Sequence, residues 1–130
     1  MEVPENLRYA RTHTWVRLEG DNLAVIGLTD HAQRELGNIV YLELPEVGFR
    51  ITSPQQPFGV IESDKAAADL YSPVCGEVVQ VHTELRDEVE NINEDPYGEG
   101  WMIVVCLENP QEVAKLLTAE EYRAFIAAEG

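Results

Sequence analysis

The alternation of apolar and polar positions in the first third of the chain predicts a hairpin followed by a short helix. Apolar residues dominate 16–18 and 23–28, and the polar run EGDN at 19–22 is typical of a tight turn between two strands. Thr29 is a suitable N-cap, because Leu28, Ala32 and Leu36 would then share one helical face. Gly37 follows where a helix C-terminus favours glycine.

Beyond the helix, the pattern predicts a series of short strands. Val40, Leu42 and Leu44 are expected on one face of the first. Further strands are expected at 58–62, 69–71, 77–81 and 101–107. The last is apolar throughout, which is typical of a strand covered on both faces, although a buried helical segment would give the same pattern.

The period becomes helical near the C-terminus. The segment 109–117 opens with an Asn-Pro cap, and Thr118 with Glu121 forms a capping box for a second helix. A stripe of Tyr122, Phe125 and Ile126 on that helix can lie on the sheet. The sequence thus predicts one mainly β domain over 1–130, with its core at about 7–107, one inserted short helix and two C-terminal helices at about 109–128.

A weak internal repeat adds to this picture. An offset of 39 residues aligns GNIVYL at 37–42 with GEVVQV at 76–81, and PFG at 57–59 with PYG at 96–98. Two matching half-barrels would produce such a repeat, although a glycine followed by aliphatic residues also recurs by chance.

Charge narrows the possible partners. The 130 residues include 9 Lys plus Arg against 24 Asp plus Glu, a net charge of −15, and 45% are apolar. Such a surface repels phosphate backbones and anionic lipid, so nucleic-acid and membrane binding are not expected. No apolar run approaches the roughly 20 residues that span a bilayer. The N-terminal residues resemble no secretion signal, and a cytoplasmic location is expected.

The residues with metal-binding or catalytic chemistry are scattered. His13, His31 and His82 stand singly, and Cys75 and Cys106 belong to no CxxC pair. Metal sites need ligands at short spacing, so no metal site is expected. The histidines are predicted to be surface or hydrogen-bonded residues and the cysteines to be buried and reduced. No nucleophile with an adjacent base can be assembled, so no catalytic site is predicted.

One lysine stands in an informative setting. Lys65 lies in a short polar insert between two apolar runs and is followed by three alanines. A hairpin tip would hold its amine away from the domain, where an enzyme could modify it. An ordinary solvated lysine beside Asp64 fits the residue types as well, and on spacing alone it is the simpler interpretation.

The sequence around this lysine resembles the attachment loop of lipoyl-carrying domains. The resemblance is carried by ESDKA at 62–66, SP at 72–73 and GEV at 76–78. It implies lipoic acid in amide linkage to Lys65, with Glu62, Ser63, Asp64 and Ala66 as the attachment loop. Biotin carriers instead have methionines on both sides of their lysine.

Longer motifs resemble the glycine-cleavage H-protein family. They are LTDHAQ at 28–33, LG at 36–37, VYLELPEVG at 40–48 and NEDPYGEGW at 93–101. The resemblance runs from about residue 7 to 125. It implies a lipoyl/biotinyl-type hybrid β barrel-sandwich, built around a quasi-twofold axis, with the inserted helix and the two terminal helices.

The same resemblance implies a carrier and not an enzyme. Its lipoyl arm would shuttle an aminomethyl group between a pyridoxal-phosphate glycine decarboxylase and an aminomethyltransferase, and dihydrolipoamide dehydrogenase would reoxidise it. A lipoate-attaching enzyme would install the cofactor. The cleft for the loaded arm would include Thr12, Thr14, His31 and Asp69.

Two residues depart from the family pattern. Thr14 replaces the glutamate of the usual His-Glu-Trp motif, and Asp64 stands before the lysine where Val or Thr is common. These changes leave open an H-like lipoate-binding protein that serves a sulfur-oxidising, heterodisulfide-reductase-like complex. A third hypothesis is a non-lipoylated H-like scaffold.

Overall fold

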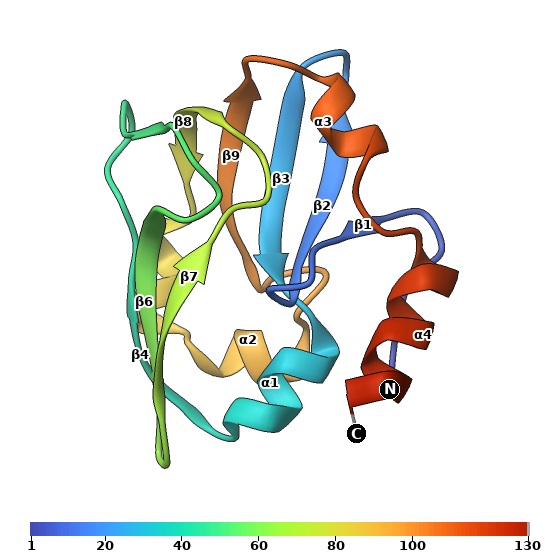
Figure 1. Cartoon of the computed structure of the whole chain (residues 1–130). Coiled ribbons are helices and arrows are strands. Elements are labelled where there is room, and N and C mark those ends of the chain that lie inside the picture. Colours follow the sequence, from blue (N-terminus) through green and yellow to red (C-terminus); the bar gives the residue numbers. More distant parts are fainter. Residues whose placement is uncertain (130) are drawn as a thin grey trace.

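The computed structural model describes residues 1–129 and contains two β-sheets with helices at their margins (Figure 1). The strands of the larger sheet, in spatial order, are β1 (Arg8–Tyr9), β2 (Thr14–Glu19), β3 (Leu23–Leu28), β9 (Trp101–Leu107), β8 (Gly76–Val81) and β5 (Arg50–Ile51). The smaller sheet has the order β4 (Ile39–Glu43), β6 (Pro57–Ser63) and β7 (Ala67–Tyr71). All neighbours are antiparallel. The predicted mainly β class is confirmed.

Two helices begin where the capping signals indicate, a third is shorter than predicted and has Pro110 in place of Asn109 as its N-cap, and two more are additional. The helices are α1 (Asp30–Leu36), the 3-10 helix η1 (Thr83–Asp87), α2 (Glu90–Glu94), α3 (Gln111–Ala114) and α4 (Ala119–Glu129). Thr29 Oγ1 accepts the Ala32 N–H at 3.2 Å, which confirms the predicted cap of α1. The capping box of α4 is also present, at 2.9 and 3.2 Å between Thr118 and Glu121. The sequence prediction missed η1 and α2, which connect β8 to β9. Within residues 1–129, no helix is both long enough and apolar enough to cross a membrane.

Alternate residues of the central strands supply two apolar clusters on opposite faces of the larger sheet. Ile26 faces the cluster between the two sheets, whereas Val25 faces a second cluster under α4. In that second cluster the rings of Tyr9 and Tyr122 stack at 4.7 Å, close to Trp15. Strands β3 and β9 are therefore covered on both faces, and the predicted apolar stripe of α4 packs on the sheet.

A β-bulge overturns the predicted alternation in β4. The pairing with β6 shifts between Ile39 and Tyr41, so Ile39 and Leu42 are buried whereas Val40 is 53% exposed. The expectation that Val40 and Leu42 share a face is thus wrong. An extra residue in one strand turns the following side chains to the other face, and the residue types do not reveal it.

The same irregularity occurs in the strand that the internal repeat aligns with β4. In β8 the pairing shifts between Val78 and Gln80, and Val79, the equivalent of Val40, is 41% exposed. Each of the two sheets therefore contains one strand with the bulge at the same repeat position. Because the two bulges fall at equivalent positions, the 39-residue repeat in the sequence corresponds to a repeated structural feature.

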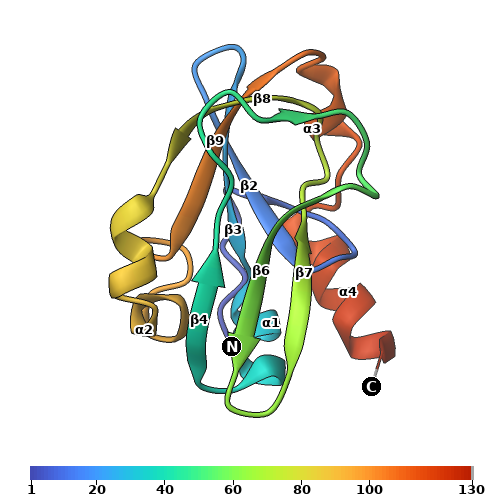
Figure 2. The same ribbon diagram turned by 90° about the vertical axis from the view of Figure 1, so that its left-hand side faces the viewer.

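The hairpin of β6 and β7 belongs to the smaller sheet, and its tip projects beside the end of α1 (Figures 1 and 2). Its register pairs Glu62 with Ala67 and Ile61 with Ala68. The fold thus brings the tip of this hairpin close to the C-terminal end of α1.

Candidate functional site

Lys65 lies at the tip of the β6–β7 hairpin, in a three-residue loop with Asp64 and Ala66. Ser63 closes this loop. Its N–H donates to the Ala66 carbonyl at 2.7 Å, and its Oγ accepts the N–H groups of Lys65 and Ala66 at 3.2 and 3.0 Å. A serine that accepts backbone donors in this way orders a turn locally. The sequence prediction of Lys65 at a hairpin tip is confirmed.

The tip contacts the residues that follow α1, Gly37 and Asn38. The Asp64 N–H donates to the Asn38 carbonyl at 3.0 Å. The Lys65 side chain passes over Gly37, where an added Cβ would lie 3.1 Å from Lys65 Cε. Gly37 has a φ of 90°, which favours glycine independently of this contact.

The Lys65 amine is free for reaction. The side chain is exposed, and within residues 1–129 the amine forms no ion pair. The flanking Ala66 and Ala67 are small and exposed, so an approaching protein meets little steric obstruction. This setting fits an acyl group in amide linkage.

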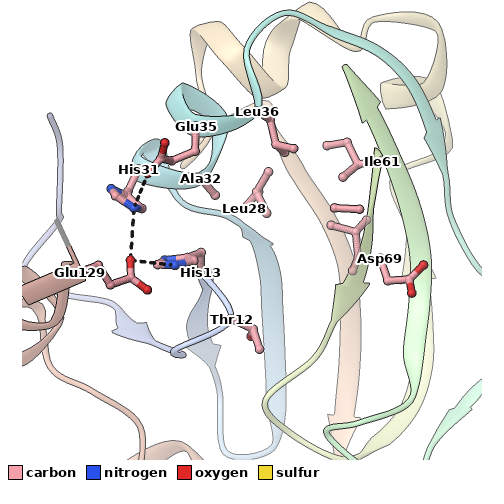
Figure 3. Close-up of a pocket in the computed structure, with 12 residues that line it drawn as sticks. Thr12, His13, Leu28, His31, Ala32, Glu35, Leu36, Ile61, Asp69 and Glu129 are labelled. Carbon is pink, nitrogen blue, oxygen red and sulfur yellow. Dashed lines mark ion pairs between the residues drawn. The ribbon is translucent and has the colours of Figure 1, made fainter. Parts of the chain in front are cut away.

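A cleft of about 530 Å³ opens between α1 and β7 (Figure 3). Four apolar residues form part of its lining: Leu28, Leu36, Ile61 and Leu70. The remaining lining residues are Thr12, His13, His31, Ala32, Glu35, Ala68, Asp69 and Glu129. Because Ala68 follows Lys65 by three residues along the hairpin, the cleft begins beside the tip.

The structure places three of the four predicted cleft residues on its wall. Thr12, His31 and Asp69 line it, whereas Thr14 is only 1% exposed. Thr14 Oγ1 is 3.5 Å from Thr12 Oγ1. The expectation that Thr14 faces the arm is therefore wrong. Asp69 is exposed at the rim, and in Figure 3 its carboxylate points away from the histidines.

Sequence reasoning missed a cluster at the opposite wall. Glu129 Oε1 lies 3.3 Å from His13 Nε2 and 3.6 Å from His31 Nε2, and Figure 3 shows both contacts. Glu35 Oε1 is also 3.6 Å from His31 Nε2. The prediction of a hydrogen-bonded histidine is confirmed for His13, but the sequence does not indicate that His13 and His31 lie together. The members of the cluster come from three distant segments, so no local spacing could have revealed it.

Hydrogen bonds to the interior hold the His13 ring in place. Its Nδ1 is 2.8 Å from the Tyr122 hydroxyl, which in turn is 2.8 Å from Thr29 Oγ1. The His13 backbone has a φ of 68°, and its carbonyl accepts the Thr29 N–H at 3.1 Å. Burial lowers the pKa of His13, although Glu129 opposes this shift. Burial also raises the pKa of the Tyr122 phenol, which keeps it neutral.

The other candidate groups lie elsewhere. His82 stacks on Trp101 at 4.3 Å, and its Nδ1 is 2.7 Å from the Trp101 carbonyl oxygen. Cys75 and Cys106 are free thiols, as predicted, but are only half-buried. Burial, followed by the charge of Glu112, raises the pKa of Cys75, which makes it a poor nucleophile at neutral pH.

Comparison with known proteins gives one consistent result. A family model described as "Glycine cleavage H-protein" matches residues 7–129. A glycine cleavage system H protein of Acinetobacter baumannii is 52% identical over 124 residues, which cover 95% of this chain and 98% of that protein. One from Rubrobacter xylanophilus is 53% identical over 126 residues, with 92% and 98% covered.

A solved structure agrees with these relatives. The crystal structure of a glycine cleavage system H protein from Mycobacterium marinum superposes with a TM-score of 0.87 at 33% identity. The match covers 96% of this chain and 99% of that one. The similarity therefore extends over both sheets and the terminal helices.

Proposed function

Since the chain belongs to the glycine cleavage H-protein family, we propose that it is a lipoyl carrier that shuttles an aminomethyl group between enzymes of the glycine cleavage system. One observation carries the proposal: Lys65 is exposed at an ordered hairpin tip with its amine unpaired within residues 1–129. The role is that of a carrier, and the reactions belong to its partners.

Lys65 would hold lipoic acid as an amide, and the loop formed by Glu62, Ser63, Asp64 and Ala66 would present it. When bound, this group supplies a disulfide that can open to accept a carbon group and close again by oxidation. Tethering keeps the arm at an effective concentration of roughly millimolar order for a docked partner. The rigid turn at Ser63 limits the movement of the attachment point itself.

The cleft would shelter the loaded arm. A strand rises about 3.3 Å per residue, so Asp69 lies roughly 7 Å along β7 from Ala67, where the Lys65 loop ends. This is within reach of a lysine side chain extended by an acyl chain. The apolar lining suits that chain, and Thr12, His31 and Asp69 offer polar groups to an amine at its end. Thr14 takes no part, because Thr14 is buried.

The proposed partners follow from this role. They are a pyridoxal-phosphate glycine decarboxylase, an aminomethyltransferase, dihydrolipoamide dehydrogenase and a lipoate-attaching enzyme. The net charge of −15 favours basic docking faces on these partners, because complementary charge speeds encounter.

A loading assay tests the proposal. The lipoylated chain is incubated with the glycine decarboxylase of the same host, labelled glycine and pyridoxal phosphate, and the label on the chain is measured by mass. We expect one aminomethyl group per chain, absent from Lys65→Arg. Asp69→Asn should shorten the lifetime of the loaded form, whereas Asp21→Asn, at an exposed turn, should not.

The outcomes separate the alternatives. A lipoylated chain that the decarboxylase cannot load would overturn the glycine role and favour a carrier for a sulfur-oxidising, heterodisulfide-reductase-like complex. A chain that carries no lipoate when isolated from its own host would favour a scaffold. An unchanged lifetime in Asp69→Asn would reject the assignment of Asp69 alone.

A further inference from the structure

We propose that His13, His31 and Glu129 form a binding site for a divalent transition-metal ion of the zinc class. Their ligand atoms all lie within 4.8 Å of one another. Two imidazoles and one carboxylate are a donor set that zinc accepts readily, with positions left open for water or another ligand. Lys65 is not part of this set, so metal binding can be tested on the chain without lipoate, although His31 is shared with the cleft proposed for the loaded arm.

The distances are close to those of a coordinated ion. In a tetrahedral site with bonds of roughly 2.0–2.1 Å, ligand atoms lie about 3.3–3.4 Å apart. Glu129 Oε1 is 3.3 Å from His13 Nε2 and 3.6 Å from His31 Nε2. Coordination therefore needs movement only on the order of 1 Å for the remaining pair, within the range of side-chain adjustment.

The surroundings hold the ligands in place. Metal-binding histidines commonly make a hydrogen bond through the second ring nitrogen. His13 does so through Nδ1, at 2.8 Å from the Tyr122 hydroxyl. Glu35 Oε1, 3.6 Å from His31 Nε2, can supply a fourth ligand or accept a hydrogen bond from a bound water.

Local charge also favours a cation. The twelve residues that line the cleft include three carboxylates and neither lysine nor arginine. The competing explanation is that Glu129 serves only as a shared acceptor for the two imidazoles. That arrangement would hold α4 against α1 without any ion, and metal titration distinguishes the two.

The test is titration of the 130-residue chain with Co²⁺, followed by visible absorption, and then displacement by Zn²⁺. Excess Mg²⁺ is present throughout, because this hard ion occupies carboxylate sites and not imidazoles. We expect one Co²⁺ per chain, displaced by an equivalent of Zn²⁺. Glu129→Gln and His31→Asn should each weaken binding at least tenfold, and His82→Asn, at a remote histidine, should leave it unchanged.

Thermal unfolding with and without Zn²⁺ supplies a second readout, since a ligand that binds the native state raises its melting temperature. The Glu129 side chain is 40% exposed, so Glu129→Gln should fold normally. Saturable binding that persists in both Glu129→Gln and His31→Asn would overturn the proposal. So would the absence of saturable binding, or its loss in His82→Asn.

Discussion

The hairpin tip and the histidine cluster lie on opposite sides of one cleft but are built in opposite ways. At the tip, four consecutive residues from Ser63 to Ala66 supply the turn, its hydrogen bonds and the reactive amine. At the cluster, His31 lies on α1, Glu129 on α4 and His13 in the turn before β2. The three side chains meet because these distant segments pack together. Local chemistry fixes the first region, and tertiary packing fixes the second.

This difference predicts how each region responds to substitution. A change at the tip should alter modification while the free energy of unfolding stays nearly constant, because the tip is exposed. A change behind the cluster should lower stability and leave modification intact, because buried hydrogen bonds there join distant segments.

The largest expected effect is the loss of lipoylation in Lys65→Arg. Arginine keeps the charge but has no amine that can form the amide. The chain has only two lysines, Lys65 and Lys115, so Lys115→Arg is a matched control. Intact mass after expression with the host ligase should show the lipoyl group on the control and none on Lys65→Arg. Both variants should unfold within about 0.5 kcal/mol of the wild type, and lipoate on Lys115 would contradict the assignment.

The next effect concerns the hydroxyl that joins the cluster to the core. Tyr122→Phe removes a group 2.8 Å from both His13 Nδ1 and Thr29 Oγ1. Leaving such groups without a partner costs about 1–3 kcal/mol. We expect urea unfolding to show a loss of about 2 kcal/mol, with lipoylation of Lys65 at the wild-type rate.

Tyr41→Phe is the control for this measurement, because Tyr41 is 45% exposed and its hydroxyl donates a hydrogen bond to the exposed Glu43 carboxylate at 3.0 Å. It should change stability by less than about 0.5 kcal/mol. Equal losses in the two variants would show that the buried hydroxyl has no special role.

The contrast also explains what sequence could predict. Thr29 and Thr118 predict the starts of their helices, because an N-cap hydrogen bond joins residues only three positions apart. The exposure of Val40 was missed because a bulge depends on the partner strand. His13 and Glu129 are 116 residues apart (129 minus 13), so the pattern of either segment says nothing of the other.

The candidate site also has one part that depends on neighbouring residues and another that depends on tertiary packing. The motif around Lys65 predicts a hairpin tip. The resemblance of this motif to lipoyl attachment loops implies lipoic acid as the cofactor, which the spacing of the residues alone does not indicate. The predicted cleft included Thr14, which is 1% exposed at the start of β2, where both faces of the strand are covered. Which residues face a cleft depends on strand register, and register is not visible in a single sequence.

A smaller effect is expected at Asp30, which is next to His31 in the cluster and whose carboxylate accepts a long-range hydrogen bond from the Glu2 N–H. Burial alone would raise its pKa, but hydrogen bonds from the Glu2 N–H, Gln33 and Arg34 outweigh burial and hold that pKa below the usual value. A depressed pKa adds stability above the unfolded-state value, and this contribution is lost as the pH falls through the folded-state value. Asp30→Asn should therefore cost about 1 kcal/mol at pH 7 and progressively less below pH 4.

Urea unfolding from pH 7 down to pH 3 measures this difference. Asp21→Asn, at an exposed turn position, removes the same charge without those hydrogen bonds and should change stability little at any pH. A constant gap between Asp30→Asn and the wild type across this range would contradict the role of the ionised carboxylate.

The smallest effect on stability is expected at the tip itself, from Ser63→Ala. Ser63 Oγ accepts two backbone N–H groups, but these donors are exposed and water can replace the oxygen, so the loss should stay below about 0.5 kcal/mol. Without Oγ the loop samples more conformations, and the attaching enzyme must select the ordered one. Lipoylation should therefore slow several-fold while the final extent stays complete. Ser53→Ala is the matched control, since Ser53 Oγ accepts the Gln55 N–H at 3.1 Å in an exposed loop away from Lys65. Equal lipoylation rates in the two variants would show that the enzyme recognises the lysine without the preformed turn, and the tip would then owe its function to exposure alone.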